Sequence, residues 1–425
     1  MMTLGRILYL QYTNPAGYPP LEHSSRFLAD AGWCVRFLGT CAQGGANRMQ
    51  FPPHTNIEVR LWPYYRPGIW QKVHYFAFGL WAFWTVLIWR PRWLYASDPL
   101  SCPIALVLSF IPGLRVLYHE HDSPSPEMTK QTTTGQLNAS FDRNDQASPA
   151  QRPCPEHTRR APAFQRLVLR CRKTLARRAI ACVLPNQARV EVFKAATGTT
   201  RPVLTIWNCP RKEEAKAGPK TDDKQLARGP DKPFLVHYHG NVSRLLVPPA
   251  LVHAAAAVSG LRFRVVGYTT CGTEGYSEVI RGCADSARPG QMLELQHALP
   301  RHELLALART AHIGVALMPK DPDDLNLQYL LGASNKLFDY MACGLAVLVS
   351  DLPDWQRMCV EPGYGLACNP NDPASIAAAL RWFVAHPEET RVMGERARQR
   401  ILSDWNYETQ FAAALRLING GAQLQ

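Results

Sequence analysis

Short apolar runs alternate with stretches of helical periodicity along most of this chain. The runs at residues 6–12, 33–39, 93–97, 114–119, 179–184 and 202–207 are followed, after residue 232, by runs at 233–238, 262–266, 292–296, 313–318 and 345–349. Helical patterns lie between them, for example at 21–31, 100–110, 249–258 and 301–309. Strands that are apolar throughout and separated by helices indicate parallel sheets covered on both faces. The pattern therefore predicts an α/β protein with two Rossmann-like doubly wound domains that face each other across a cleft.

Two segments interrupt this alternation. Residues 123–160 are rich in Thr, Gln, Ser, Pro and Asn, which predicts a mobile insertion. Residues 211–232 are charged, contain Gly and Pro and have no apolar period, which predicts a linker. We therefore expect an N-terminal domain over 1–210 and a C-terminal domain over 233–404. Residues 405–425 are expected to form a terminal helix that packs back on the first domain.

Residues 334–351 combine a short helix, a glycine stop and a buried strand. Ser334 suits a helix N-cap, and Gly344 suits the position just past the helix end. Asn335, Lys336 and Asp339 share one face of this helix. A cation and an amide at a helix N-terminus favour an anion, which suggests a nucleotide diphosphate with its ribose on Asp339. The alternative is a solvated helix face with an ordinary Lys–Asp pair.

Polar residues follow several predicted strands, where ligands bind in doubly wound sheets. Glu120, His121 and Asp122 follow the strand at 114–119 and are the catalytic candidates. The loop after the first strand offers Gly17 and Glu22, unless it is a plain connecting loop. A metal at 119–122 is not expected, because neighbours in an extended segment point to opposite sides and no further ligand cluster supports it.

The first half of the chain is both aromatic and basic. Residues 75–89 carry no charge and would span roughly 22 Å as a helix, which is short for a bilayer core of about 30 Å. Trp81 and Trp84 suit either a helix at a membrane interface or a large buried helix. The stretch 159–178 has eight Lys and Arg and no acid, and its stripe of Arg166, Arg170, Lys173 and Arg177 suits an anionic surface unless it is a solvated face.

The charge distribution agrees with a local anionic partner. Residues 1–210 hold 24 Lys and Arg against 11 Asp and Glu, whereas residues 211–425 hold 23 of each, so the net charge of +13 lies in the first half. Anionic lipid or a lipid-linked phosphate is expected, and nucleic acid is not, because no nucleic-acid-binding module accompanies the stripe. The 12 cysteines lack Cys-x-x-Cys spacing and no signal peptide is visible, which favours a cytoplasmic protein peripheral to the membrane.

The stretch 334–351 closely resembles the signature of retaining nucleotide-sugar glycosyltransferases of the GT-B fold, in the family-four group. The glycine loop near Gly17, residues 118–122, the Pro185-Asn186-x-x-Arg189 motif and the glycines at 240 and 267 agree in order. The resemblance implies that Asp339 holds the donor ribose and that Asn335 and Lys336 flank the diphosphate. It places Gly240 and Arg244 near the phosphates, Gly267 near the base and His121 at the donor sugar. It also implies no metal or cofactor. The basic, aromatic first half predicts a membrane-linked acceptor, such as a lipid-linked glycan.

Two departures from the family pattern keep other functions open. Leu331 stands where many relatives carry a glutamate that touches the transferred sugar, with Asn326 a nearby polar substitute. The usual lysine after the Gly240 loop is also missing. A degenerate binding subunit and a nucleotide-sugar epimerase are therefore the alternatives to a transferase. An oxidoreductase is not expected, because no Gly-x-Gly-x-x-Gly follows the first strand.

Overall fold

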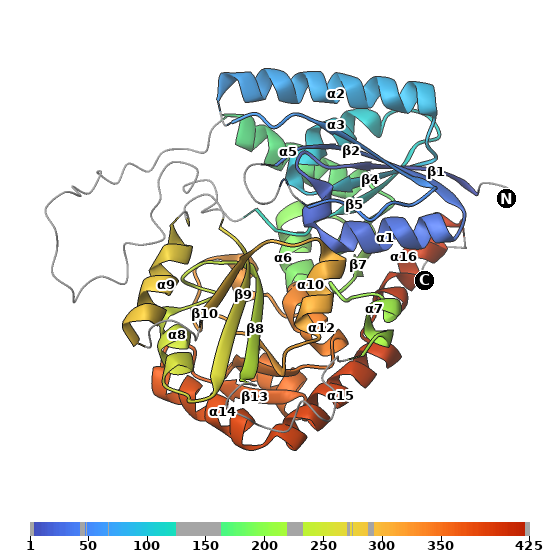
Figure 1. The fold of residues 1–425 in the computed structure, drawn as a ribbon. Helices are drawn as coiled ribbons and strands as arrows, with labels where there is room; N and C mark the ends of the chain where they lie inside the picture. The colour runs from blue at the N-terminus through green and yellow to red at the C-terminus, as the bar shows by residue number, and fades with distance from the viewer. Residues whose placement is uncertain are drawn as a thin grey trace, which may run out of the picture.

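The computed structural model of the chain describes residues 4–42, 47, 49–66, 68–124, 163–218, 233–269, 273, 275–287 and 293–420. Its strands form two sheets in which every described pairing is parallel. The first sheet has the order β3-β2-β1-β4-β5-β6-β7 and the second β10-β9-β8-β11-β12-β13 (Figure 1). Two doubly wound parallel sheets confirm the predicted fold class.

The first sheet is built from seven strands, of which the edge strands β3 and β7 are the least buried. The strands are β1 (Gly5–Leu10), β2 (Trp33–Thr40), β3 (Ile57–Trp62), β4 (Trp93–Ser97), β5 (Arg115–His119), β6 (Ala181–Leu184) and β7 (Val203–Thr205). One face packs against α2 (Ile69–Trp89), α3 (Cys102–Leu108), α5 (Ala163–Arg178) and α6 (Gln187–Thr197). The other face packs against α1 (Pro19–Asp30) and α16 (Tyr407–Ile418).

The second sheet has a single large core around it. Its strands are β8 (Phe234–Asn241), β9 (Leu261–Tyr268), β10 (Leu293–His297), β11 (Ile313–Ala316), β12 (Ala346–Ser350) and β13 (Gly365–Cys368). The helices are α8 (Pro249–Ala256), α9 (Tyr276–Ala287), α10 (Arg301–Ala308), α11 (Leu325–Gln328), α12 (Asn335–Ala342), α13 (Pro353–Trp355), α14 (Pro373–Ala385) and α15 (Pro387–Ser403). All five residues of β12 are buried, as its apolar sequence predicts.

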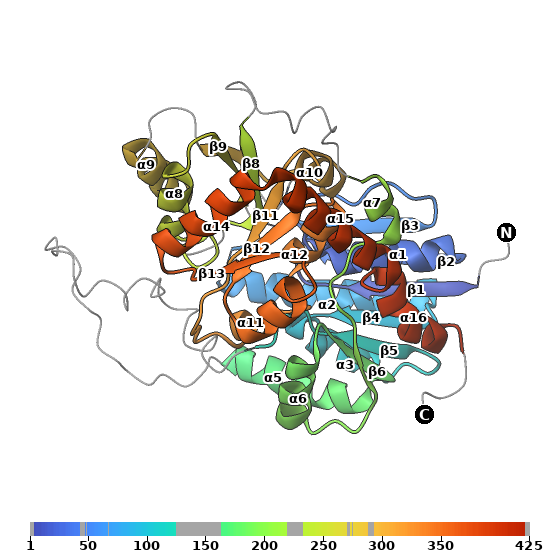
Figure 2. The same ribbon diagram turned by 90° about the horizontal axis from the view of Figure 1, so that it is seen from below.

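The chain passes between the two sheets twice. Helix α7 (Lys212–Lys216) leads from the first domain to the second, and α15 continues into α16, which returns to the first (Figure 2). Tyr407, Phe411 and Ile418 of α16 are fully buried in the cluster that contains β1, β2 and β4. The segment 211–232 was predicted to be a linker, and its first part forms α7, where Glu214 caps the helix by accepting from the Arg211 amide. Residues 219–232, and the insertion predicted at 123–160 beyond residue 124, lie outside the described residues.

Helix α2 is longer than its uncharged stretch and forms the outer edge of the first domain (Figure 1). Its inner face buries Tyr75, Phe78 and Ala82, while its outer face leaves large apolar side chains exposed. The exposed residues, here called the α2 ridge, are Ile69, Trp70, Val73, Phe76, Leu80, Trp84, Leu87 and Ile88. Across the described residues, no helix combines the length and hydropathy that crossing a membrane requires.

Candidate functional site

Helix α12 begins and ends where the sequence predicts. Ser334 occupies the N-cap position, although its side chain makes no capping hydrogen bond. Gly344 has φ 76°, a left-handed conformation that glycine adopts without steric cost, and the chain then enters β12. The first residue of the helix, Asn335, has a buried side-chain oxygen without a hydrogen-bond partner. A buried orphan atom at a helix start is a place where a ligand can bind.

Gly240, Gly267 and Lys336 come together at the carboxyl end of β8. Gly240 pairs with Gly267 on β9, and a side chain at Gly267 would collide with the Gly240 carbonyl. The Lys336 side chain lies against Gly240, and a Cβ added to Gly240 would be 3.5 Å from Lys336 Nζ. The ammonium sits 5.6 Å from the Tyr238 ring centroid, and burial lowers the pKa of Lys336 to about 8. A cation held against bare backbone at a strand end is suited to a phosphate group.

The Asp339 carboxylate is held by Arg301 rather than by Lys336. Two guanidinium nitrogens of Arg301 donate to it at 2.7 and 3.1 Å, and His239 Nε2 lies 3.3 Å away. The residue is only 2% exposed, so a solvated helix face is excluded. Burial raises the pKa of Asp339, but the charges of Arg301 and His239 outweigh it and leave the carboxyl below its usual pKa. Asp339 therefore stays charged, with both oxygens already engaged.

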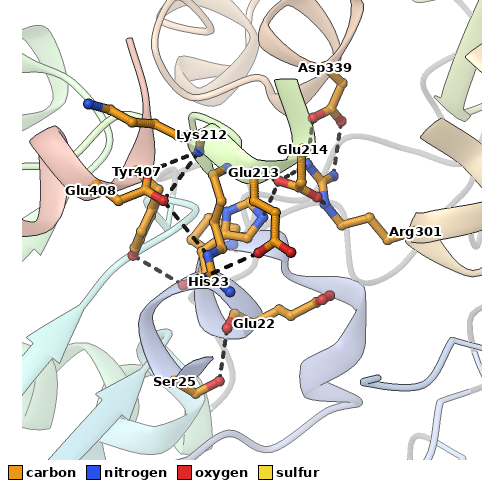
Figure 3. Close-up of polar contacts among 12 residues, drawn as sticks. Glu22, His23, Ser25, Lys212, Glu213, Glu214, Arg301, Asp339, Tyr407 and Glu408 are labelled. Carbon is orange, nitrogen blue, oxygen red and sulfur yellow. Dashed lines mark hydrogen bonds and ion pairs between the residues drawn. The ribbon is translucent and has the colours of Figure 1, made fainter. Parts of the chain in front are cut away.

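Arg301 continues this contact into the first domain. Its Nε and Nη2 donate to Glu214 of α7 at 2.6 and 3.2 Å, and the Glu214 carboxylate lies 3.1 Å from His23 Nε2 of α1 (Figure 3). Burial acts to raise the pKa of Glu214, but Arg301 and His23 lower it well below its usual range. Glu22 lies next to His23 and Glu214, and burial raises the pKa of Glu22. The four residues from Asp339 to His23 form a buried ionic chain that joins the two domains.

The three acidic and histidine candidates after β5 lie on different sides. Glu120 points into the first domain, where Arg172 donates to it at 2.5 and 2.7 Å, so its carboxylate is used inside the core. The His121 ring lies on the other side, 5.0 Å from the Tyr18 ring, with an unpartnered Nε2. Burial lowers the pKa of His121 to about 3, so the ring is neutral. The Asp122 side chain is exposed and lies 3.6 Å from Arg189.

The Asn186 and Arg189 motif fastens the two domains together. Asn186 donates to the carbonyls of Tyr329 and Leu331 at 2.9 and 2.8 Å. Arg189 is 1% exposed and donates to the carbonyls of His121, Asn326 and Tyr329. The side-chain amide of Asn326 both accepts from and donates to the Ser123 backbone. The segment around Leu331 is therefore held against the first domain by backbone contacts, and the Asn326 amide is occupied in this link.

The remaining site residues predicted from the sequence lie near the surface of the molecule or near the ends of strands. Gly17 ends the short 3₁₀ helix η1 (Pro15–Gly17) after β1, and Arg244 is exposed in the loop after β8. Trp81 stacks on Trp62 with centroids 5.0 Å apart, whereas Trp84 is 58% exposed on the α2 ridge. The α5 residues Arg166, Arg170, Lys173 and Arg177 are all exposed, and Arg177 donates to the Thr197 carbonyl. Within the described ranges, no group of three His, Cys, Asp or Glu is placed to hold a metal.

Sequence reasoning did not find several residues of this region. Arg301 and Glu214 were assigned to an ordinary helix and to the linker, and no local pattern marks either. Asp98 follows β4 and was also missed. Only the structure marks it, since it is a non-glycine residue with a φ of 64°. Gln11, directly after β1, donates to it at 3.0 Å. The order of the strands, rather than any motif, brings Gln11 and Asp98 together.

Comparison with known proteins agrees with this architecture. Residues 248–416 match a protein-family profile described as Glycosyl transferase-like, and no curated protein sequence matches the chain significantly. Sucrose-phosphate synthase from Thermosynechococcus elongatus is similar with a TM-score of 0.64 at 17% identity, over 97% of this chain and 98% of that one. Anabaena HepE in complex with UDP and glucose gives 0.65 at 15% identity, over 97% and 99%. WaaG, a glycosyltransferase involved in lipopolysaccharide biosynthesis, gives 0.60 at 13% identity, over 98% and 100%.

Proposed function

We propose that this chain transfers a sugar from a nucleotide-diphosphate sugar to a membrane- or lipid-linked glycan, with retention and without a metal. The premise of this proposal is that the chain is a glycosyltransferase of the group 1 type with the GT-B fold. The observation that carries the donor half is the group of Gly240, Gly267, Asn335 and Lys336 at the end of β8. Structures of HepE hold UDP and UDP-glucose, which supports a nucleotide sugar as the donor.

In this proposal the diphosphate lies at the start of α12, with Lys336 as its counter-ion. Lys336 and the helix amides stabilise the negative charge that develops as the diphosphate leaves. The neutral His121 orients the sugar through its free Nε2 rather than attacking it. The acceptor hydroxyl approaches from the face that the diphosphate leaves, so the configuration at the anomeric carbon is retained. Lys336 supplies the positive charge that a metal supplies in other transferases.

The acceptor half of the proposal rests on the α2 ridge. A ridge of large apolar side chains open to water is unusual, and it suits insertion into the headgroup region of a bilayer. Val107 on α3 and Phe110 just after α3 are also exposed, and the Arg178 guanidinium carbon lies 4.0 Å from the centroid of the Phe110 ring. Helix α5, which carries exposed basic residues, packs next to α3 (Figure 1). An apolar ridge and exposed cations on the same domain suit an anionic lipid surface, where a lipid-linked acceptor would lie.

A second candidate is a donor-binding subunit without transferase activity. It is favoured by the Asp339 carboxylate, whose two oxygens are engaged by Arg301 and His239 instead of being open to a ribose. Leu331, an apolar residue whose backbone carbonyl accepts from Asn186, also favours it. Such a subunit would bind the nucleotide but would leave the sugar in place.

Donor titration followed by product analysis tests the proposal. UDP-, GDP- and ADP-sugars are titrated calorimetrically into the full chain, and the donor that binds is then incubated with a lipid extract that contains glycolipid acceptors. We expect one donor to bind, with release of its nucleoside diphosphate and a labelled lipid of unchanged anomeric configuration, with EDTA present. Binding without release over several hours would favour the second candidate. Absence of binding by all three donors would refute both.

A further inference from the structure

The Asp339 carboxylate lies where the pentose of a bound nucleotide would follow its phosphates. Asp339 comes three residues after Lys336 in α12, so the two side chains share one face of the helix. A nucleoside diphosphate has its pentose joined directly to the phosphates, so a diphosphate beside Lys336 brings the pentose hydroxyls toward Asp339. A carboxylate binds such a diol by accepting a hydrogen bond from each hydroxyl. The acceptor positions that Asp339 has left therefore decide how the pentose is recognised.

Three of the roughly four acceptor positions of this carboxylate are occupied. Arg301 Nη2 donates to Asp339 Oδ1 at 2.7 Å, and Arg301 Nη1 donates to Oδ2 at 3.1 Å. His239 Nε2 lies 3.3 Å from Oδ2, and because an ionised carboxylate can only accept, this nitrogen carries the proton and donates. Asp339 is 2% exposed, so the remaining position is inside the protein. A diol, which needs two acceptor positions, does not fit on this carboxylate as it is held.

The Arg301 guanidinium is also fixed from its other side, which opposes its displacement by a pentose. Its Nε and Nη2 donate to the Glu214 carboxylate at 2.6 and 3.2 Å, and the Arg301 side chain is only 11% exposed. Breaking a buried ion pair costs a factor of more than about 100 in an equilibrium constant. One hydroxyl bound to a charged group contributes a factor of about 10 to 150, so the exchange brings no net gain. The contact between Arg301 and Asp339 is therefore expected to persist in the complex.

The neighbouring carboxylates do not take the place of Asp339. Glu214 accepts from two nitrogens of Arg301 and lies 3.1 Å from His23 Nε2, so its oxygens are engaged as well. Glu22 lies at the first-domain end of the ionic chain, next to His23 (Figure 3). The pentose beside α12 therefore meets a carboxylate whose hydrogen-bonding capacity is used within the protein.

We propose that the donor site does not select the 2′-hydroxyl of the pentose, so that it takes nucleoside diphosphate sugars of both the ribose and the 2′-deoxyribose series. This inference rests on the proposed function and defines its class of donor more closely. Arg301 sets the tolerance, because it occupies the carboxylate of Asp339. The donor is then anchored through its phosphates, by Lys336 and the start of α12. The ribose contact of Asp339 that the family resemblance implies is not part of this binding mode.

Calorimetric titration with matched nucleotides tests the inference. UDP, GDP and ADP are each titrated into the full chain beside their 2′-deoxy analogues, so that the base and the phosphates are the same within each pair. The variant is Arg301→Lys, because a lysine keeps the positive charge but lacks the fork that binds both carboxylates. Arg309→Lys is the matched control, since Arg309 donates to the Glu214 backbone carbonyl rather than to a carboxylate. Thermal melting of both variants verifies that they are folded.

For the base that binds, the ribose and deoxyribose forms should have dissociation constants within about threefold of each other in the wild-type chain. A carboxylate that bound the 2′-hydroxyl would make them differ about 10- to 150-fold, so a preference of tenfold or more for the ribose form overturns the inference. In Arg301→Lys, Asp339 gains a free acceptor position, and the ribose form should become the tighter ligand by about fivefold or more, unlike in Arg309→Lys. An unchanged ratio in folded Arg301→Lys would overturn the part assigned to Arg301.

The same titrations distinguish this inference from the proposed function. If no nucleoside diphosphate of either series binds, the proposed function fails and the inference fails with it. If the ribose series alone binds, only the inference fails. If both series bind equally but incubation with donor sugars and acceptors yields no transfer, the inference holds and the transferase activity is refuted. The wild-type ratio decides the inference even where Arg301→Lys does not fold.

Discussion

Replacing Lys336 with methionine should make the free protein more stable and the donor complex weaker. Burial lowers the pKa of Lys336 from 10.5 to about 8. Because one unit of pKa corresponds to about 1.4 kcal/mol, keeping this ammonium charged inside the fold costs up to about 3 kcal/mol. The contact of the ammonium with the Tyr238 ring is already part of the folded protein and offsets roughly 0.5–2 kcal/mol of this cost. We therefore expect Lys336→Met to raise the free energy of unfolding by about 1–3 kcal/mol at pH 7.

The pH dependence distinguishes this cause from better packing. The unfolded lysine binds a proton up to about pH 10.5, while the folded one releases it near pH 8. The stability of the wild-type chain therefore rises with pH between these values, and the advantage of Lys336→Met should shrink over the same interval. Urea unfolding at pH 7, 8.5 and 10 measures it. Lys194→Met, which removes an exposed ammonium, is the matched control and should change little.

The same variant should lose donor affinity. A charged hydrogen bond to a phosphate contributes about 1.5–3 kcal/mol, so the dissociation constant for the donor should rise about 10- to 150-fold in Lys336→Met. Calorimetric titration of both proteins with the nucleotide sugar that the wild-type chain binds measures this change. A variant that is less stable than wild type at pH 7 and binds the donor unchanged would refute the reasoning on both counts.

Three further predictions follow from buried or exposed groups. Arg301→Met removes the guanidinium shared by the carboxylates of Glu214 and Asp339, which keep only weaker partners such as their histidine neighbours, so urea unfolding should show a loss of about 3–5 kcal/mol, and a loss below about 1 kcal/mol would contradict the ionic chain. Burial raises the pKa of Asp98 to about 8, so the wild-type chain should lose stability relative to Asp98→Asn as the pH rises from about 4 to 8, by at most about 1.4 kcal/mol per pH unit in urea unfolding; a constant difference would be the contrary result. Trp84→Glu should reduce flotation with anionic liposomes without lowering the melting temperature, and the membrane proposal would fail if flotation stayed the same.

The residues of the proposed donor site could be predicted from the sequence because their signals are local. The N-cap, the glycine stop and the buried strand specify α12 and β12 within 17 residues, and Lys336 then has to lie at the strand ends. Gly240 and Gly267 lie at the carboxyl ends of two neighbouring parallel strands, so their proximity follows from the predicted topology. These inferences needed only secondary structure and the order of elements.

The partners of Asp339 and Glu120 could not be predicted from local signals in the sequence. Arg301 lies 38 positions before Asp339, and whether it points to solvent or to a carboxylate depends on how α10 packs beside α12. Glu120 and His121 are adjacent, but an extended backbone sends them to opposite sides, and only one side faces Arg172 of the basic segment. Side-chain pairing across elements depends on packing angles and registers that one sequence does not show.

The return of α16 to the first sheet has a consequence for engineering and for evolution. Because Tyr407, Phe411 and Ile418 complete the core around β1 and β4, residues 1–210 alone would expose that apolar face. The second domain is therefore an insertion within the first, rather than a module placed after it. A chimera that exchanges the second domain between two such proteins needs two crossover points, one near α7 and one between α15 and α16. Recombination at a single point would leave each hybrid with a core made from two unmatched parents.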